Sequence, residues 1–251
     1  MPKTSYLYLL LTLEYDGFNY HGFIKQNDVK TIQGEVESAF FSICNQKLWT
    51  IGASKTDAGV HAEDQKILVK LPFHPVNLDY FIFTLNKILP LDINIKEHKI
   101  VDRKFSVRGC KQKEYIYKIN DGTFDLKMAR YELKVDKKLD VTKLQEIANI
   151  FIGKHDFFNL SGVKRSENKE TVRKIDDIVV KRLNNDKINV HFFGKGFIRY
   201  QVRMIMQNIL ECYNDKITIE KIKQQIQIGA EYDKTIYCAK PYGLTLKKIH
   251  Y

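Results

Sequence analysis

The amino-acid sequence predicts an α+β protein built from two halves with a similar order of elements. Strand-like segments rich in β-branched and aromatic residues alternate with amphipathic helical segments, and this order recurs after residue 105. The recurrence suggests duplication of a ferredoxin-like unit. The chain has 251 residues, enough for two such units with hydrophobic cores. We therefore expect an N-terminal half over residues 1–105 and a C-terminal half over residues 106–251.

The N-terminal half opens with a predicted strand, SYLYLLLTLEY, at residues 5–15. A helix is expected over residues 31–45, because apolar residues recur on one helical face behind Thr31 as N-cap. A second helix begins at Asn77 and is stopped by a proline. Alternation and β-branched content predict the other strands of this half at residues 49–54, 65–71 and 93–101.

The C-terminal half repeats strands and helices in a similar order. Its predicted strands are at residues 113–120, 171–183, 187–194 and 243–249. Amphipathic periodicity predicts its helices at residues 140–153, 197–213 and 218–229, the first closed by Gly153. The segment SGVKRSENKE, residues 161–170, is polar enough to be a mobile loop.

The formal net charge of +11 points to a polyanionic partner. Basic residues are spread in small groups over the chain and form no single tail, which suits a broad folded surface. These groups are Lys111/Lys113, Lys164/Arg165, Arg173/Lys174, Lys181/Arg182 and Lys247/Lys248. A solvated lysine-rich surface is the alternative, so charge alone leaves nucleic-acid binding open.

Cysteine, histidine and hydropathy patterns favour a cytoplasmic protein without disulfides, a metal site or a membrane segment. Four scattered cysteines, with no C-x-x-C pair, indicate reduced core thiols in a cytoplasmic protein: Cys44, Cys110, Cys212 and Cys238. The seven dispersed histidines give no basis for a metal site. No apolar run approaches the roughly 18 residues of a spanning helix, and Glu14 and Asp16 end the apolar N-terminal segment, so we expect no membrane segment.

Three distant segments carry residues suited to chemistry on a nucleic acid. The acidic loop SKTDAGVHAED, residues 54–64, places Asp57 close to Lys55, a cation that would keep the carboxylate ionised. Tyr115 and Tyr117 have strand spacing among lysines and could stack on a base. Arg203 follows Arg199 by one turn of the predicted helix 197–213.

Each of these residues also has an ordinary structural interpretation. Asp57 could be a turn acid, Tyr115 a core residue and Arg203 a solvated helix arginine. His61 could form an acid/base pair with Asp57, although bonding to backbone is the favoured interpretation. Glu63 and Asp64 look like solvated loop acids, but a two-carboxylate hydrolase would also use such residues.

The combination of segments resembles one known family. KTDAGVHA resembles the R-T-D-x-G-V-H-A signature of the tRNA pseudouridine synthases of the TruA family. Further matches follow in the family's order along nearly the whole chain: LEYDGFNYHGF, TIQGEVESAF, FSVRGCKQKEYIYKI, GKHDFFNLS, TVRKI, GKGFIRYQVRMI and KPYGLTL.

The resemblance implies a fold and an activity. The fold is the pseudouridine synthase fold, in which two ferredoxin-like halves share a continuous antiparallel sheet with flanking helices and a central basic cleft. The activity is isomerisation of uridine to pseudouridine at positions 38–40 of the tRNA anticodon stem-loop. It requires no metal, redox or nucleotide cofactor, and family members act as homodimers so that one tRNA touches both subunits.

The resemblance also implies roles for particular residues. Asp57 is the catalytic nucleophile, Tyr115 stacks on the target uracil, and Arg203 pairs with Asp57 and orients it. Lys55 stands where the family usually has arginine and would support the flipped nucleotide. Arg108 matches a family arginine that contacts the RNA or the active site. The chain further departs from the family's pattern in having phenylalanine at position 23 and glutamine at position 201.

Two other functions compete with this interpretation. The first is a catalytically inactive RNA-binding paralogue, against which the retention of Asp57, Tyr115 and Arg203 argues. The second is an unrelated hydrolase using Asp57 and Glu63, which explains neither the basic charge nor the tyrosine strand.

Overall fold

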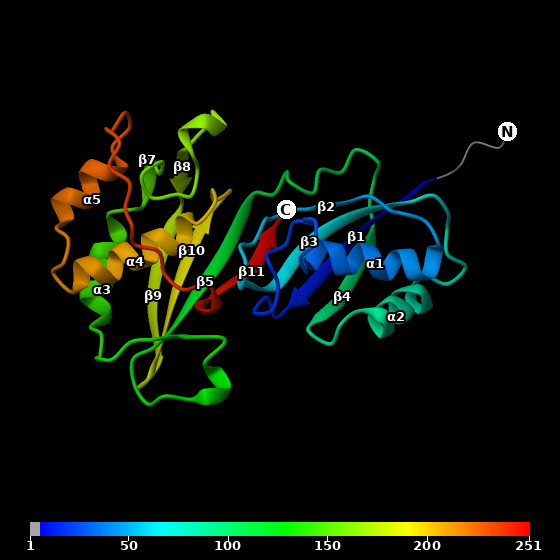
Figure 1. The fold of residues 1–251 in the computed structure, drawn as a ribbon, viewed down its shortest axis with the longest axis horizontal. Helices are drawn as coiled ribbons and strands as arrows, with labels where there is room; N and C mark the ends of the chain where they lie inside the picture. Colours follow the sequence, from blue (N-terminus) through cyan, green and yellow to red (C-terminus); the bar gives the residue numbers. More distant parts are fainter. Residues whose placement is uncertain (1–5) are drawn as a thin grey trace. The chain divides into compact units, whose positions relative to one another are not determined.

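The computed structural model describes residues 6–251, so Ser5, the first residue of the predicted strand 5–15, lies outside the described residues. The chain divides into two compact units (Figure 1). Unit 1 holds the described residues up to Lys111 together with Leu246–Tyr251, and unit 2 is Gln112–Thr245. Each unit combines strands with helices, so the predicted α+β class is confirmed.

Unit 1 has the order strand, helix, strand, strand, helix, strand. Its elements are β1 (Leu7–Tyr15), α1 (Ile32–Cys44), β2 (Thr50–Gly52), β3 (His61–Leu71), α2 (Leu78–Ile88) and β4 (Ile93–Ile100). β1 lies between β4 and β3, antiparallel to both, and β2 pairs with β3. The two helices lie together over one face of these strands, with the rings of Phe40 and Phe81 6.1 Å apart (Figure 1). This is the arrangement of a ferredoxin-like unit.

The helices of unit 1 begin where their capping residues predict. The Thr31 hydroxyl accepts a hydrogen bond from the Gly34 N–H at 3.2 Å, which satisfies one of the free donors of the first turn of α1. The Asn77 side chain accepts from the Tyr80 N–H at 2.9 Å at the start of α2. α2 ends at Ile88, because Pro90 disfavours helical backbone in Leu89, the residue before it.

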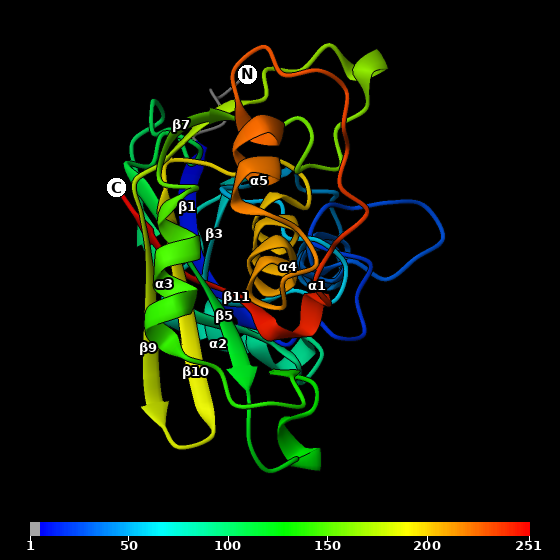
Figure 2. The ribbon, with the colours of Figure 1, turned by 90° about the vertical axis from the view of Figure 1, so that its left-hand side faces the viewer.

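Unit 2 repeats this order with additions. Its elements are β5 (Gln112–Asn120), β6 (Leu133–Lys134), α3 (Val141–Asn149), β7 (Gly153–Asp156), β8 (Val172–Ile175), β9 (Asp177–Asn184), β10 (Lys187–Gly194), α4 (Gln201–Tyr213) and α5 (Ile219–Ile226). β10 lies between β5 and β9, antiparallel to both, and β6 adds a parallel pairing, so the sheet is mixed. α3 packs beside β9 and α4 (Figure 2), while β7 and β8 form a separate hairpin-like pair.

The final strand, β11 (Leu244–His250), crosses from one unit into the other. By chain order it is the last element of the second repeat, and the sequence places it with residues 106–251. From Leu246 onward it belongs to unit 1, where the Ile249 N–H donates to the Asp64 carboxylate at 2.9 Å. The Tyr251 hydroxyl donates to the Val107 carbonyl at 2.7 Å. Element order could not indicate this return.

Three predicted elements of unit 2 have different limits in the structure. α3 ends at Asn149, and Gly153, with φ of +107°, opens β7 instead of closing the helix. The predicted strand 171–183 is interrupted at Asp176, where β8 leaves to pair with β7. α4 begins only at Gln201, because Tyr200 has the left-handed φ of +65°, which interrupts helical backbone.

The segment 161–170, predicted as a mobile loop, contains a short 3₁₀ helix at Arg165–Glu167. Two of the four cysteines, Cys110 and Cys212, are buried as expected, whereas Cys238 is exposed. Over residues 6–251, no helix has both the length and the apolar character needed to cross a bilayer.

Candidate active site

Residues 53–60, called here the Asp57 loop, connect β2 to β3. The loop is shorter than the predicted segment 54–64, because β3 already begins at His61 and pairs with the end of β1, Ala62 opposite Tyr15. Asp57 is half-buried. Its backbone carbonyl accepts a hydrogen bond from the Val60 N–H at 3.2 Å across the turn.

Gln65 of β3 fixes the entry of the Asp57 loop. This side chain is fully buried, and its Oε1 accepts from the Ser54 N–H at 3.1 Å while its Nε2 donates to the Ser54 carbonyl at 2.9 Å. The amide thus pairs both backbone groups of one loop residue, as a neighbouring strand would. Ser54 is consequently held three residues before the carboxylate.

A second set of contacts holds the residues on either side of Asp57. The Thr56 carbonyl accepts from the Phe23 N–H at 3.1 Å, and the Thr56 and Tyr15 hydroxyls share a hydrogen bond of 2.7 Å. The Gly59 N–H donates to the Tyr20 carbonyl at 3.1 Å. The backbone at Asp57 is therefore fixed by β1 and by the segment that follows it.

Glycines allow that segment, residues 17–23, to approach the Asp57 loop. A Cβ on Gly17 would lie 2.0 Å from the Val60 carbonyl oxygen, and one on Gly22 would lie 2.9 Å from the Thr56 carbonyl oxygen. Gly22 also has a φ of +94°, which disfavours any other residue. Gly17 and Gly22 are thus required because any side chain at these positions would clash with the backbone of the Asp57 loop.

His61 bonds to backbone, the interpretation that the sequence favoured. Its Nδ1 accepts from the Gly17 N–H at 3.1 Å and lies 3.0 Å from a carboxylate oxygen of Asp16. The His61 ring is buried at the start of β3, next to residues 17–23. It therefore helps to hold residues 17–23 against the Asp57 loop.

The prediction that Asp64 is a solvated loop acid is wrong. Its side chain is buried in β3, where it accepts from the Lys66 ammonium at 2.9 Å, the Ile249 N–H at 2.9 Å and the Lys248 ammonium at 3.2 Å. Glu63 is likewise in β3 and forms an ion pair with Lys247. Both acids neutralise lysines within unit 1, which weakens the alternative of a two-carboxylate hydrolase.

Lys55 and Arg108 are the two predicted cations of unit 1. The Lys55 side chain is exposed and leaves the Asp57 loop two residues before the carboxylate. Arg108 is exposed on the segment between β4 and β5. Its neighbour Val107 is buried and bonded to the Tyr251 hydroxyl, and Cys110 is buried as well. The backbone on both sides of Arg108 is anchored while its side chain reaches solvent.

Tyr115 and Tyr117 lie in β5 of unit 2 and are both buried. The Tyr115 ring meets Phe197 edge-on, with ring centroids 5.4 Å apart. The Tyr117 hydroxyl donates to the Lys240 carbonyl, and a Cβ on Gly243 would lie 2.6 Å from the Tyr117 ring. Burial raises the pKa of Tyr117 far above its ordinary value. Tyr117 is therefore a structural residue.

Arg203 lies in the first turn of α4 and is half-buried, so the solvated interpretation does not fit it. Its Nε donates to the Ala239 carbonyl at 2.9 Å, and the Ala239 N–H donates back to the Arg203 carbonyl at 3.1 Å. The guanidinium carbon lies 5.1 Å from the centre of the Tyr200 ring. These contacts hold the guanidinium in a defined place.

Arg199, by contrast, precedes α4 and does not share its face with Arg203. It donates through Nε to the Gly162 carbonyl at 2.9 Å and pairs with Glu167 at 2.6 Å. This arginine ties the segment 161–170 to the start of α4, a role that the predicted helix 197–213 could not reveal.

Besides Lys55, the two further departures from the family pattern lie in the core. Phe23 is fully buried against Gly52, where a Cβ would lie 2.2 Å from the Phe23 ring. Gln201 is fully buried at the start of α4 and accepts from the Ile198 N–H at 2.9 Å. Its Nε2 has no hydrogen-bond partner among residues 6–251.

The structure places the predicted site residues in both units. Lys55 and Asp57 share one loop of unit 1, with Arg108 on a second segment of that unit, whereas Tyr115 and Arg203 belong to unit 2. Nowhere in the described part of the chain do three His, Cys, Asp or Glu side chains gather as a metal site.

Comparisons with known proteins agree along the length of the chain. A family model described as tRNA pseudouridine synthase matches residues 147–251. Over 245 residues the chain is 56% identical to tRNA pseudouridine synthase A of Spiroplasma kunkelii, covering 98% of this chain and 94% of the relative. It is 45% identical to the protein of that name from Mesoplasma florum, covering 96% and 97% of the two chains. The corresponding protein of Acetivibrio thermocellus is 37% identical, with 96% and 98% covered.

Proposed function

Since the chain belongs to the tRNA pseudouridine synthase A family and thus isomerises uridine in tRNA, we propose that it modifies positions 38–40 of the anticodon stem-loop, with Asp57 as nucleophile. The observation that carries this proposal is the position of Asp57 within KTDAGVHA, in a loop whose backbone is held on both sides of the carboxylate.

The reaction explains why a carboxylate is needed. The bond between uracil N1 and ribose C1′ breaks, the base rotates, and C5 bonds to C1′. The C5 proton is lost and N1 gains a proton, so there is no net redox change. A carboxylate can attack the ring or the ribose, or stabilise the developing cation, provided that it is ionised and oriented.

The other site residues serve this carboxylate and the base. Arg203 pairs with Asp57 and orients it, and Tyr115 stacks on the target uracil and assists loss of the C5 proton. Support for the Arg203 role is its rigid attachment to Ala239, which leaves little freedom to the guanidinium. The Tyr115 ring is likewise fixed by Phe197.

Lys55 and Arg108 contact the RNA. A uridine in the anticodon stem is paired and stacked, so its reacting atoms become accessible only when the nucleotide is flipped out. Lys55, exposed beside Asp57, supports the stem after flipping, and exposed Arg108 contacts the RNA backbone.

The proposal includes a cytoplasmic homodimer, with no membrane partner and no small-molecule cofactor. One tRNA then touches both subunits, as the family resemblance implies. Sedimentation at micromolar concentration should give twice the mass of the chain. A monomer that still modifies tRNA would overturn the shared-substrate arrangement.

The decisive experiment uses tRNA carrying tritium at uracil C5. Pseudouridine formation releases this label, whereas an inactive RNA-binding protein or a hydrolase would not. Asp57→Asn keeps the shape of the side chain and removes the nucleophile, so label release should stop while tRNA still binds. Asp28→Asn, at an exposed loop position, is the matched control and should retain turnover. Near-normal turnover by Asp57→Asn would show that the assignment is wrong.

A further inference from the structure

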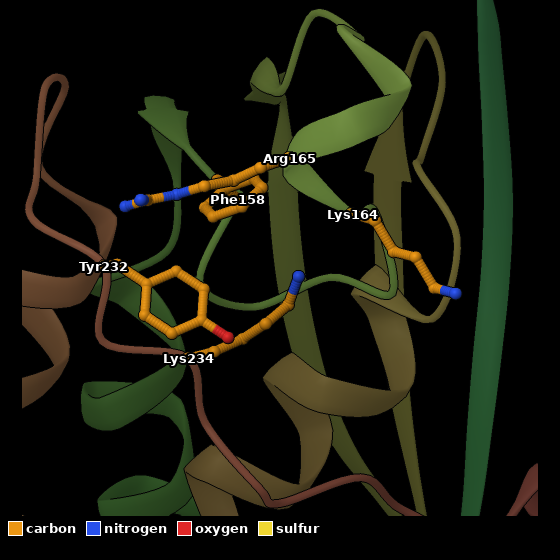
Figure 3. Close-up of a pocket in the computed structure, with 5 residues that line it drawn as sticks. All are labelled: Phe158, Lys164, Arg165, Tyr232 and Lys234. Atoms are coloured by element: carbon orange, nitrogen blue, oxygen red, sulfur yellow. The ribbon is translucent and has the colours of Figure 1, made fainter.

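Unit 2 carries a pocket whose chemistry the isomerisation reaction does not use. The pocket has a volume of about 380 Å³ and is lined by Phe158, Lys164, Arg165, Tyr232 and Lys234 (Figure 3). Two of these side chains are aromatic and three are cationic, and no acid lines the pocket. Lys164 and Arg165 come from the polar segment 161–170.

The aromatic side chains form a pair that is partly open to solvent. The ring centroids of Phe158 and Tyr232 are 6.1 Å apart, and Tyr232 is 58% exposed. The guanidinium carbon of Arg165 lies 4.7 Å from the centre of the Tyr232 ring, and the Lys234 ammonium 4.4 Å from that of Phe158. Figure 3 shows Arg165 extending over the aromatic pair while Lys234 rises from the other side.

The segments that supply these side chains are held together by buried polar contacts. Asn159 is 2% exposed; its Nδ2 donates to the Glu231 carbonyl at 2.9 Å, and its Oδ1 accepts from the Asp233 N–H at 3.0 Å. The Lys234 ammonium donates to the Val163 carbonyl, which connects the segment carrying Tyr232 and Lys234 to the segment carrying Lys164 and Arg165. These contacts fix the segments that line the pocket relative to each other.

Two acids of the neighbouring segments already have cationic partners. Glu167 accepts from Arg199, and Asp233 pairs with Lys221 at 2.5 Å. Burial lowers the pKa of Lys234, and the charge of Arg199 lowers it further. Three cations in the lining of one pocket, with no acid among the lining residues, favour an anionic ligand.

We propose that this pocket binds an unstacked nucleotide of the RNA substrate, other than the uridine that is isomerised. The flat face of the base stacks on Tyr232 and Phe158, and its phosphate lies among Lys164, Arg165 and Lys234. Aromatic rings interleaved with cations are the usual platform for single-stranded nucleic acid, because every base has a π-face and every nucleotide a negative charge. The proposal rests on the proposed function in that the RNA is tRNA.

The test measures the dissociation constant of an unmodified full-length tRNA transcript by filter binding. Tyr232→Leu should weaken binding by about 5- to 150-fold, the range expected for loss of one stacked base. Tyr232→Phe keeps the ring and should stay within about twofold of the parent protein. Since Tyr232 is largely exposed, the thermal unfolding midpoint should be unchanged in both variants.

Helix α2 offers a matched control. Tyr80 is 68% exposed and stacks on Phe83 with ring centroids 6.3 Å apart, and the Lys87 ammonium lies 5.2 Å from the Phe83 ring. This exposed group combines aromatic and cationic side chains, as the pocket does, but on the surface of a helix. Tyr80→Leu should leave the dissociation constant unchanged.

A second arm separates the phosphate contact from stacking. Replacing both Lys164 and Arg165 by glutamine should reduce the slope of log affinity against log salt by about 1, because both cations contact the same phosphate. Tyr232→Leu should leave this slope as it is while weakening binding at every salt concentration.

Three results would overturn the proposal. Tyr232→Leu could bind as tightly as the parent protein, or Tyr232→Phe could lose as much affinity as Tyr232→Leu, which would assign the effect to the hydroxyl. Poly-glutamate could compete as well as RNA per unit charge, which would make the pocket a general anion site. Binding and label release are measured separately, so active Asp57→Asn would refute the proposed function and leave this result standing.

Discussion

Asp57 is an acid in a chain with net charge +11, and an exposed lysine, Lys55, stands two residues before it. Lysine offers a compact charge on a flexible stem, whereas arginine donates in a planar fork and can stack. If Lys55 only keeps Asp57 ionised, either cation would serve. If it supports the stem from which the uridine has been flipped, arginine should do so better.

We therefore predict that Lys55→Arg raises the single-turnover rate on full-length tRNA. A good bidentate contact is worth about 1 to 3 kcal/mol, which corresponds to about a 5- to 150-fold effect. The rate should be compared on an isolated loop containing an unpaired uridine, where nothing has to be flipped. Lys55→Ala should be severely impaired on both substrates.

A gain confined to the paired stem would support the flipping role. Equal rates of the parent protein and Lys55→Arg on both substrates would leave Lys55 as a simple electrostatic partner of Asp57.

Motif and spacing predicted the candidate catalytic residue and its loop, but they did not predict what holds that loop. Gln65 reads as an ordinary polar position at the start of a strand, and its two hydrogen bonds to Ser54 depend on a tertiary approach. Asp64 looked solvated for two reasons. Its partner Lys248 is 184 residues away in sequence. Its other partner, Lys66, lies on the same side only because β3 already includes Asp64, whereas the predicted strand began at residue 65. Such partners exist only once the sheet has formed.

At the scale of elements, the Asp57 loop depends on β3 through Gln65. Gln65→Leu would leave the N–H and the carbonyl of Ser54 buried without their partners, at a cost of about 1 to 3 kcal/mol for each group. The loop should relax to recover hydrogen bonds, which displaces the carboxylate.

We predict that kcat of Gln65→Leu falls about 10- to 100-fold, because a displacement of about 1 Å can have that effect. Asn77→Ala, which removes the N-cap of α2, is the control for simple destabilisation: it should lose about 1 kcal/mol of stability and keep its kcat. Parental kcat in Gln65→Leu would show that the loop is held without the amide.

A buried ion pair stabilises the end of β5 in unit 2. Asp121 accepts from Arg182 of β9 at 3.1 and 2.7 Å and from the Leu139 N–H at 2.9 Å. Burial alone would raise the pKa of Asp121, but these hydrogen bonds outweigh it and lower the pKa to about 2. The native state therefore favours the ionised carboxylate more than the unfolded chain does.

This shift predicts a defined pH dependence. With an unfolded pKa of about 3.9, the pair contributes roughly 2 to 3 kcal/mol above about pH 4, and the contribution is lost as the pH falls towards 2. Urea unfolding of the parent protein and of Asp121→Asn should differ clearly at about pH 6 and converge at about pH 2. A difference independent of pH would mean that Asp121 acts through shape and not through its charge.

Capping residues and apolar periodicity predicted where α1 and α2 begin, since both signals are local. They could not predict the break at Asp176 or the late start of α4, because β8 leaves for a partner strand and Tyr200 adopts a left-handed conformation next to Gly162. Local propensity indicates which secondary structure a segment can form, whereas tertiary contacts determine which of its residues the helix or strand includes.

For the whole molecule, the basic charge predicts the character of RNA binding. Lysines and arginines that neutralise phosphates release counterions, so affinity falls as salt rises. If about six phosphates are neutralised, tRNA affinity should drop about a thousandfold between roughly 50 and 200 mM salt. Fluorescence anisotropy over this range measures the slope. Affinity that hardly changes with salt would assign binding to non-ionic contacts.

The return of β11 to unit 1 has a consequence for biosynthesis. Residues 246–251 leave the ribosome after all of unit 2, although the rest of unit 1 is made first. Until then, the nascent protein has β3 without its β11 neighbour and Asp64 without the Ile249 N–H and the Lys248 ammonium. A premature stop codon after residue 245 would thus damage the earliest-made half, the one that bears Asp57, and leave the later half nearly whole.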